Sequence, residues 1–521
     1  MKKNHLQHLA ADFPASIVVL LVAIPLCLGI ALGSGAPLFS GIIAGIIGGI
    51  VIGILSGSHL SVSGPAAGLT VIVAAAITKL QVFDAFLLAV VLAGLFQIVF
   101  GYLKAGVIGD YVPNAVIKGM LAAIGLILIL KQLPHLVGYD ADFEGDMSFK
   151  QADNQNTLTE ILASFEQFSP AAILIGILSL SILTLWETKF FKKTKWLQLI
   201  PGPLVVVLMA IALHTWIQAN NPELALQQEH MVNLPIATDT QHFLSFFTFP
   251  DFSQIINPAV WSAALTIALV ASLETLLGIE AVDKLDPLKR ISPSNLELKA
   301  QGVGNMVSGL LGGLPMTSVV VRSSANVAAG GKTKMSTILH GILMLLCVAF
   351  IPKLLNLIPL SALAAVLIFT GYKLAKISIF KEFYSKGWDQ FGPFLITILA
   401  ILFTDLLVGI CIGIVAGLFF LVRSNFRSSI LMVNDNNHYL VRLRKDVSFL
   451  NKPVIKKLLE EIPENAFVIV DATRADFIDK DVIEEINSFI QHAHLKNIRF
   501  SIKKSQHKPT HLLFLSNTQA S

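Results

Sequence analysis

The chain has 521 residues, of which 54% are hydrophobic and only 14% are charged, and its formal net charge at pH 7 is +4. Soluble globular proteins carry about 25% charged residues, and a soluble chain of this length could not cover so much apolar surface with wettable side chains. The composition therefore excludes an ordinary soluble protein and indicates that most of the chain lies in a membrane, in contact with membrane lipid. The small net charge says little about partners, and we expect no nucleic acid among them.

Apolar runs recur along the chain, and a helix needs about 20 apolar residues to cross the hydrocarbon core of a bilayer. Some of the runs are too short to cross alone. We count fourteen of them, at residues 17–32, 42–55, 69–77, 86–100, 116–130, 171–185, 199–213, 260–279, 298–311, 319–329, 338–351, 360–374, 394–403 and 406–422.

The positive residues of the short loops predict the topology, because loops rich in lysine and arginine stay on the cytoplasmic side. Lys2 and Lys3 precede the first run, which places the N-terminus inside. The loops after the sixth, eighth, tenth and twelfth runs carry Lys189, Lys192, Lys193, Lys195, Lys284, Lys289, Arg290, Lys332, Lys334, Lys373, Lys376, Lys381 and Lys386. The loops after the fifth and seventh runs carry Asp140, Asp142, Glu144, Asp146, Glu223 and Glu229. This pattern predicts a multi-pass protein of the inner (plasma) membrane with both termini in the cytoplasm.

The two halves of the chain resemble each other. With a shift of 256 residues, Ala44, Gly48, Gly53 and Gly57 lie on Ala300, Gly304, Gly309 and Gly313, and with a shift of 246, Pro113, Leu121 and Gly125 lie on Pro359, Leu367 and Gly371. Seven spans in each half would invert the second half relative to the first, which is typical of secondary transporters. The alternative is chance, because small residues recur wherever membrane helices touch.

The third and tenth runs are short and occupy corresponding places in the two halves. Each follows a polar, glycine-rich stretch, at residues 61–68 and 312–318. Helix N-termini carry unpaired N–H groups and a partial positive charge, so two that face each other would make an anion cradle from backbone. We expect Pro65 in the first turn of the third helix, where its missing N–H costs nothing. The residues predicted to bind substrate are Gly64, Pro65, Ala66, Ala67, Gly68, Ser318, Val319, Val320 and Arg322. The simpler alternative is that Gly64-Pro65 only breaks a helix.

Arg322 and Glu274 are charged residues inside apolar runs. Arg322 lies near the start of the tenth run, and Glu274 lies in the middle of the eighth. A charge within the membrane is costly and usually functional, and a guanidinium can bind an oxyanion through parallel hydrogen bonds. We therefore assign Arg322 to the anion and Glu274 to a coupling ion, H⁺ or Na⁺. The alternatives are a structural Glu274–Arg322 pair, or an Arg322 that reaches the membrane edge.

The sequence lacks the patterns of catalysis and of metal binding. It contains no Walker loop, nucleophile elbow or zinc motif, each of which needs fixed residue types at fixed spacing. We read Cys27, Cys347 and Cys411 as small core residues, because each lies in an apolar run. We expect a protein that is not an enzyme and that needs no cofactor beyond a coupling ion.

Several motifs along nearly the whole chain resemble the SulP family of anion transporters. They are Asp12-Phe13-Pro14-Ala15, Ala23-Ile24-Pro25-Leu26, Ser63-Gly64-Pro65-Ala66, Gln301-Gly302-x-Gly304-Asn305, Gly312-Gly313-Leu314-Pro315, Arg322-Ser323 and Gly330-Gly331-Lys332-Thr333. The resemblance implies a core domain of spans one to four and eight to eleven, and a gate domain of the remaining spans. It also implies elevator-like movement between these domains, a homodimer, and a substrate such as sulfate, bicarbonate, chloride or oxalate.

The resemblance also bears on the coupling ion. In bicarbonate transporters of this family, Na⁺ uses an acid on the eighth span and small polar residues on the tenth. Glu274 matches the acid, so a Na⁺ ion near Glu274 and Ser318 is one candidate. Val319 and Val320 stand where a polar side chain would be expected, which argues against it. Arg322 matches members that place a positive side chain beside the anion.

The pattern changes at Asn434, and we divide the chain into an anion-transport domain at 1–430, a soluble domain at 434–505 and a flexible tail at 506–521. The soluble domain is predicted to have strands at 439–443, 466–470 and 498–502 and helices at 452–462 and 481–494. Asp471-Ala472-Thr473, followed by Phe477-Ile478-Asp479, resembles the STAS domain that follows SulP membrane domains. STAS relatives often carry a phosphorylatable serine just after this motif. Lys480 and Asp481 stand there in this chain, so we expect no such regulation.

These observations predict an α-helical polytopic membrane protein of two inverted seven-span repeats, with a small cytoplasmic α/β domain. The leading hypothesis is a secondary active transporter of sulfate or bicarbonate with elevator-type alternating access. A nucleobase or organic-anion transporter of the same fold is an alternative, because that family also places an acid on the eighth span. Arg322 and the STAS tail argue against it. A passive channel or exchanger is another alternative, and Glu274 favours coupling instead.

Overall fold

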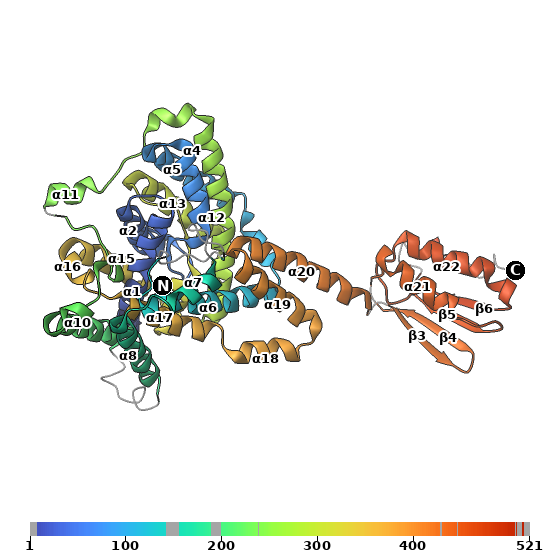
Figure 1. Cartoon of the computed structure of the whole chain (residues 1–521). Helices are drawn as coiled ribbons and strands as arrows, with labels where there is room; N and C mark the ends of the chain where they lie inside the picture. Colours follow the sequence, from blue (N-terminus) through green and yellow to red (C-terminus); the bar gives the residue numbers. More distant parts are fainter. Residues whose placement is uncertain are drawn as a thin grey trace. The chain divides into compact units, whose positions relative to one another are not determined.

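The computed structural model describes residues 8–141, 149, 156–188, 200–237, 239–427, 430–444, 446–505, 507 and 513–514. By its contacts the chain divides into two units, Met1–Ile414 and Val415–Ser521, and Figure 1 labels most of their helices and several of their strands. Each unit is described by itself, and the domain boundaries at 430 and 434 stay predictions. Some residues used for the topology lie outside the described residues: Lys2, Lys3, Asp142, Glu144, Asp146, Lys189, Lys192, Lys193 and Lys195. Most of the predicted tail at 506–521 lies outside them as well.

Helices make up most of the first unit, and each of the fourteen apolar runs contains one. This is expected because the bilayer core has no water to satisfy backbone groups, so the groups must pair within the segment. The elements up to the long loop at 221–257 are α1 (Leu9–Gly33), α2 (Leu38–Ile47), the π-helical η2 (Gly48–Ile52), α3 (Gly53–Leu55), β1 (Ser63–Pro65), η3 (Ala67–Leu69), α4 (Thr70–Leu80), α5 (Phe83–Tyr102), η4 (Ala105–Tyr111), α6 (Asn114–Val137), α7 (Thr157–Ser164), α8 (Pro170–Trp186) and α10 (Gly202–Asn220).

The second half of this unit is also mainly helical, and its last helix, α20, extends past the unit boundary at Ile414. After η6 (Pro222–Leu224), η7 (Gln228–His230), α11 (Thr240–Ser245) and η8 (Phe252–Ile256) come α12 (Pro258–Leu285), α13 (Ser294–Leu311), β2 (Met316–Ser318), α14 (Val320–Ala328), α15 (Met335–Phe350), α16 (Pro352–Leu355), α17 (Leu360–Leu374), α18 (Ile377–Ser385), α19 (Trp388–Phe403) and α20 (Leu406–Arg427). In the described part of the chain, seven helices are long and apolar enough to cross a membrane. The chain is therefore a multi-pass membrane protein, and the count of fourteen crossings stays a prediction.

Buried apolar side chains form two large clusters in this unit. The first joins α1, α2, α4, α5, α12, α13 and α15. The second joins α6, α8, α10, α17 and α19 with one side of α1, α12 and α14. Residues of α1 and α12 occur in both clusters, so the clusters meet along these two helices, whereas α14 belongs to the second.

The contact between α6 and α17 is reciprocal. Pro113 and Pro359, which the shift of 246 residues superposes, are the N-caps of these two helices. A Cβ added to Gly125 would lie 2.6 Å from the carbonyl oxygen of Gly371, and one added to Gly371 would lie 2.5 Å from that of Gly125. Two helices related by a twofold axis would touch at equivalent residues in this way. The inverted repeat itself stays a prediction.

Asp12 at the start of α1 belongs to the first of the sequence motifs and binds the last of them, Gly330-Gly331-Lys332-Thr333. Its carboxylate accepts hydrogen bonds from the backbone N–H groups of Lys332 and Thr333, at 2.7 and 3.0 Å, and from the Thr333 hydroxyl at 2.5 Å. Asp12 is fully buried, so these bonds satisfy a carboxylate that would otherwise be costly to bury. The Gly330–Thr333 loop therefore fixes the start of α1.

Asp140, just after α6, forms a cluster with two histidines, His135 of α6 and His230 of η7. Asp140 accepts hydrogen bonds from Nδ1 of His135 and Nδ1 of His230, both at 2.5 Å, and Glu229 lies 3.7 Å from Nε2 of His230. The bond to Asp140 raises the pKa of His230. Burial raises the pKa of Asp140, but the bonds from His135 and His230 outweigh it and hold the pKa below its usual range. Asp140, the one acidic residue of that predicted loop within the described residues, is thus bound to the end of α6.

This cluster makes the stability of the protein depend on pH. The charge on His230 stabilises the fold fully below the ordinary histidine pKa of about 6.5, and this contribution is lost as the pH rises through the raised pKa. The charge on Asp140 is lost only in acid below about pH 4. We expect His230→Asn to lower the melting temperature of the purified protein at about pH 6, and this difference to shrink by about pH 9. His494→Asn, at an exposed position of the second unit, is the control. A deficit of equal size at both pH values would contradict the assignment.

The second unit is a small α/β fold around one four-stranded sheet. Its elements are β3 (Ile430–Asp435), β4 (His438–Leu443), η9 (Phe449–Asn451), α21 (Lys452–Glu460), β5 (Phe467–Asp471), α22 (Lys480–Ala493), η10 (His494–Lys496) and β6 (Arg499–Lys503). The sheet order is β3-β4-β5-β6, with β3 and β4 antiparallel and the other neighbours parallel. The three predicted strands and two predicted helices are confirmed. The sequence analysis missed β3.

Candidate functional site

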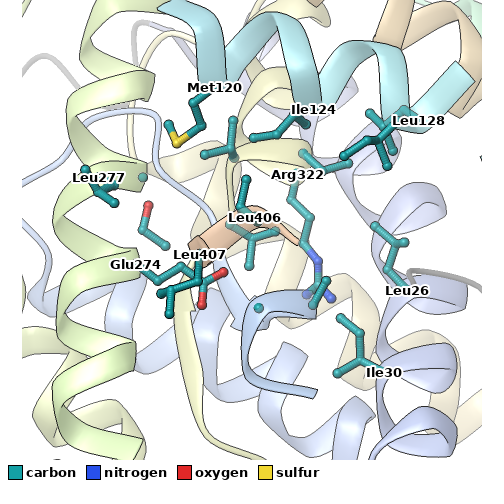
Figure 2. A pocket seen from close by; sticks show the side chains of 18 of the residues that line it. Leu26, Ile30, Met120, Ile124, Leu128, Glu274, Leu277, Arg322, Leu406 and Leu407 are labelled. Atoms are coloured by element: carbon teal, nitrogen blue, oxygen red, sulfur yellow. The ribbon is translucent and has the colours of Figure 1, made fainter. Parts of the chain in front are cut away.

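A cavity of about 60 Å³ lies where α1, η3, α6, α12, α14 and α20 approach one another, which is several times the room that one water needs. Most of its wall is apolar, with Leu26 and Ile30 from α1 and Met120, Ile124 and Leu128 from α6 (Figure 2). The ionisable side chains in its wall are Arg322, Glu274 and Lys131. Charges in an apolar enclosure interact with one another more strongly than they would in water.

Two short strands bring the broken segments of the two halves together. β1 and β2 pair antiparallel, with Ser63 opposite Ser318, Gly64 opposite Thr317 and Pro65 opposite Met316, and all six residues are buried. Helical structure begins at Ala67 on one side of this crossing and at Val320 on the other. The expectation that the two segments meet in the interior is therefore confirmed.

The expected place of Pro65 is wrong. Pro65 ends β1, and the helical turn starts two residues later at Ala67. The backbone carbonyl oxygen of Pro65 accepts a hydrogen bond from Nη2 of Arg322 at 3.4 Å. The strand is favoured because the residue before a proline avoids the helical region.

The backbone N–H groups that could hold a ligand differ slightly from those predicted. The amide of Val319 donates to the carbonyl of Val62 at 3.0 Å, and that of Ser318 donates to Oγ1 of Thr275 at 3.4 Å. The first turn of α14, residues 320–322, keeps amides without an intrahelical acceptor. On the other side, the Gly68 amide donates to Glu274, which leaves the amide of Ala67. The predicted cradle is thus shifted by about one residue along α14.

Arg322 is fully buried and only partly satisfied. Apart from the 3.4 Å bond of Nη2 to Pro65, its Nε and Nη1 atoms have no hydrogen-bond partner in the described part of the chain. The thiol of Cys27, a weak acceptor, lies beside the guanidinium. A buried charge that lacks a counter-charge costs several kcal/mol, and an anion beside Arg322 would offset this cost. Arg322 does not reach the membrane edge.

Glu274 and Arg322 occupy different sides of the cavity (Figure 2). Oε2 of Glu274 has no hydrogen-bond partner among the residues that the structure describes, and no ion pair joins the two side chains within this part of the chain. The alternative of a structural Glu274–Arg322 pair is therefore not what the structure shows.

The donor set near Glu274 suits a proton better than a metal ion. The Ser318 hydroxyl already hydrogen-bonds that of Ser61 at 2.6 Å, and Val319 and Val320 bring apolar side chains to the cavity. Within the described residues, no group of three His, Cys, Asp or Glu side chains could hold a metal ion. A Na⁺ ion here would depend on backbone oxygens and on one carboxylate.

A polar face of α13 supports the crossing, and the sequence analysis missed its role. Nε2 of Gln301 donates to the Ser63 hydroxyl at 2.6 Å and to Glu297 at 3.0 Å. Asn305 binds both backbone groups of Met316, accepting from the N–H at 2.6 Å and donating to the carbonyl at 3.1 Å. All of these side chains are buried. Their spacing of four residues along one helix face was the available signal.

Gly64 gives a test of how tightly Arg322 is held. A Cβ at Gly64 would lie 2.1 Å from Nη1 of Arg322, so Gly64→Ala must move the guanidinium. We expect this variant to lower anion affinity about tenfold, which is the loss of roughly 1.4 kcal/mol, with a small change in melting temperature. Gly109→Ala, where the added Cβ meets Leu276 at an ordinary 3.4 Å, is the control for titration with sulfate. Unchanged affinity in Gly64→Ala would show that the position of Arg322 does not matter.

Comparison with known proteins agrees with this architecture. The proposed sulfate transporter YvdB of Bacillus subtilis is 27% identical over 450 residues, covering 86% of this chain and 80% of YvdB. The bicarbonate transporter BicA of Picosynechococcus is 24% identical over 424 residues, covering 79% of this chain and 70% of BicA.

Two solved structures share the fold. The transmembrane domain of a cyanobacterial BicA has a TM-score of 0.54 at 21% identity, covering 79% of this chain and 98% of that domain. SLC26A9 has a TM-score of 0.65 at 14% identity, covering 98% of this chain and 87% of that structure. The model of the sulfate permease family matches residues 9–398. The chain therefore belongs to the sulfate permease family, as the SulP motifs indicate.

Proposed function

We propose that the protein is a secondary transporter of small inorganic anions of the sulfate or bicarbonate class. The observation that carries the proposal is the buried Arg322, with two nitrogens unpartnered in the described part of the chain, beside the first turn of α14. A guanidinium and helix N-terminal amides are the groups that bind oxyanions. The names of YvdB and BicA, which refer to sulfate and bicarbonate transport, support the same class.

The binding groups come from Arg322, the amides of residues 320–322 and the amide of Ala67. The other predicted residues, Gly64, Pro65, Ala66, Gly68, Ser318 and Val319, shape the crossing that holds these groups. A nucleobase is a poorer ligand, because it carries no fixed negative charge to balance Arg322. The named relatives are transporters, and we propose no enzymatic reaction.

Alternating access would come from relative movement of the two helix groups. Most helices of the first hydrophobic cluster belong to the core domain that the resemblance implies, and most helices of the second belong to the gate domain. α1 and α12 contribute to both clusters, and α14, a core helix, contributes to the second. The cavity lies where the clusters meet, so an elevator-like displacement of one group would carry the site across the membrane. Fourteen crossings, the inverted repeat, the homodimer, the inner-membrane location and cytoplasmic termini belong to the same proposal.

The second unit is proposed to be a STAS domain at the cytoplasmic C-terminus. Its mixed sheet and the Asp471-to-Asp479 segment support this assignment. Arg442 donates to Asp471 at 3.1 Å, and the Thr473 hydroxyl donates to it at 2.6 Å. These bonds stabilise the turn of the motif, and they assign no regulatory role.

Uptake by proteoliposomes tests the function. Purified full-length protein is reconstituted, and entry of labelled sulfate and labelled bicarbonate is measured with an inward H⁺ gradient, an inward Na⁺ gradient or neither. We expect accumulation of one of these anions under one of the two gradients. Absence of anion entry above that of empty liposomes under every condition would contradict the proposal.

A further inference from the structure

Glu297, in the first turn of α13, is a fully buried carboxylate that the proposed function does not use. Its Oε2 accepts a hydrogen bond from the Ser56 hydroxyl at 2.5 Å, and its Oε1 accepts one from Nε2 of Gln301 at 3.0 Å. The backbone N–H of Ser58 is a third donor. All three donors are neutral. A buried carboxylate without a cationic partner is costly, and one at membrane depth usually serves a function.

The charged groups around Glu297 do not balance its charge. No ion pair of the described residues includes Glu297, and the charged side chain that acts on it most strongly is another acid, Asp283 of α12. The one cation of α13, Lys299, lies over the ring of Tyr102, 3.8 Å from its centroid. α5, which packs along α13, has a single charged residue, Asp84, at the opposite end of α13. An ionised Glu297 therefore adds an uncompensated negative charge to this part of the interior.

A chain of contacts leads from Glu297 to the anion site. Nε2 of Gln301 donates to the Ser63 hydroxyl at 2.6 Å as well as to Glu297. Ser63 begins β1, and a Cβ on the next residue, Gly64, would lie 2.1 Å from Nη1 of Arg322. Traced along these contacts and ordinary bond lengths, the carboxylate and the guanidinium are about 15 Å apart at most. Salt screens buried charges much less than exposed ones, so a charge on Glu297 acts on an anion held by Arg322.

We propose that Glu297 is a regulatory carboxylate of the anion site, whose negative charge weakens anion binding at Arg322 from the other side of the β1–β2 crossing and whose protonation strengthens it. This inference rests on the proposed function and adds to it a group outside the cavity wall. The Coulomb energy is twice as large for a dianion as for a monoanion. Sulfate should therefore respond more strongly than bicarbonate, a dependence on charge that a purely structural role of Glu297 would not produce.

The test is titration of the purified full-length protein in lipid nanodiscs with sulfate and, separately, with bicarbonate. We expect Glu297→Gln to strengthen bicarbonate binding about threefold and sulfate binding about tenfold, the effect of one charge about 15 Å away in an effective dielectric of about 20 to 40. The glutamine keeps the shape of the side chain, and its amide can accept from Gln301 and donate to the Ser56 hydroxyl. Glu280→Gln, which neutralises a carboxylate paired with Lys284 at 3.0 Å, is the matched control and should bind both anions like the wild type.

The pH dependence of sulfate binding gives a second readout on the same proteins. Protonation removes the charge from Glu297 in the wild type, whereas Glu297→Gln has no charge to lose. The advantage of the variant over the wild type should therefore shrink as the pH is lowered. An advantage of the same size at every pH would contradict the role of protonation.

The outcomes separate this inference from the proposed function. If Glu297→Gln weakens the binding of both anions and lowers the melting temperature, the carboxylate only holds α13 against β1 and the inference is wrong. If Glu297→Gln matches the wild type while Arg322→Met weakens sulfate binding, the proposed function stands and the inference falls. If the wild type binds neither anion, both are contradicted.

Discussion

Arg322→Met is expected to abolish most anion binding without destabilising the fold. The side chain is fully buried, and two of its nitrogens lack partners in the described part of the chain. It therefore contributes little to the stability of the protein when no anion is bound. A charged hydrogen bond contributes about 1.5–3 kcal/mol, which corresponds to a loss of roughly ten- to hundredfold in affinity for each such bond. Methionine fills a similar volume with a flexible apolar chain. Titration with sulfate and a melting curve measure the two effects.

The melting curve distinguishes a binding role from a structural one. Removing an uncompensated buried charge relieves a cost of several kcal/mol, so the melting temperature of Arg322→Met should stay level or rise. Arg322→Lys should recover only part of the affinity, because an ammonium lacks the planar fork of a guanidinium. Arg442→Met is the control, since it removes an arginine that pairs with Asp471 in the second unit. Unchanged sulfate affinity in Arg322→Met would remove the residue from the site.

Glu274→Gln is expected to abolish gradient-driven accumulation while leaving anion exchange. The glutamine keeps the shape of the side chain and can still accept the hydrogen bond from the Gly68 amide, so the cavity should stay intact. The glutamine can neither take up a proton nor balance a cation, because a side-chain amide does not ionise. Accumulation should fall to the level of passive equilibration, and exchange of labelled for unlabelled anion should continue.

Glu280→Gln provides the matched control on the same helix. Glu280 pairs with Lys284 at 3.0 Å and does not contribute to the cavity wall, so its neutralisation should leave accumulation unchanged. If proteoliposomes that contain the Glu274→Gln variant accumulate anion as the wild type does under the H⁺ and Na⁺ gradients, the coupling role is wrong. If it loses exchange as well, Glu274 serves binding and not coupling.

The helices of this protein could be predicted because the membrane restricts which backbone structures can cross it. Every long apolar run must satisfy its own backbone in lipid, and each of the fourteen runs contains a helix. Their ends were less predictable. α12 continues to Leu285, past Glu280 and Lys284, because these charged residues pair on the helix surface after the apolar run has ended.

The meeting of the broken segments could also be predicted, since the internal resemblance placed them at corresponding positions. Their pairing as strands could not, because three residues form too short a pattern to show alternation. This is why Pro65 was assigned to a helical turn. The polar contacts from Gln301 and Asn305 depend on the same crossing, so their partners could not be identified before it was known.

The ionic contacts made at and near the end of α6 left no signal in the sequence. His230 lies 90 residues from Asp140 along the chain, and Glu160, whose Oε2 lies 3.8 Å from Nζ of Lys131, belongs to a short helix that is not an apolar run. Spacing rules detect groups that share one helix or strand. Spacing rules cannot detect contacts that form only when a distant loop folds back onto a helix end. This is why Asp140 was predicted only as part of an acidic loop.

The most direct test of the anion site is an anomalous difference map from crystals grown with selenate, which has the charge and shape of sulfate. The structure predicts a selenium peak within hydrogen-bonding reach of the Arg322 guanidinium and of the amides of Val320 and Val321. Peaks confined to the protein surface, with none beside Arg322, would contradict the account.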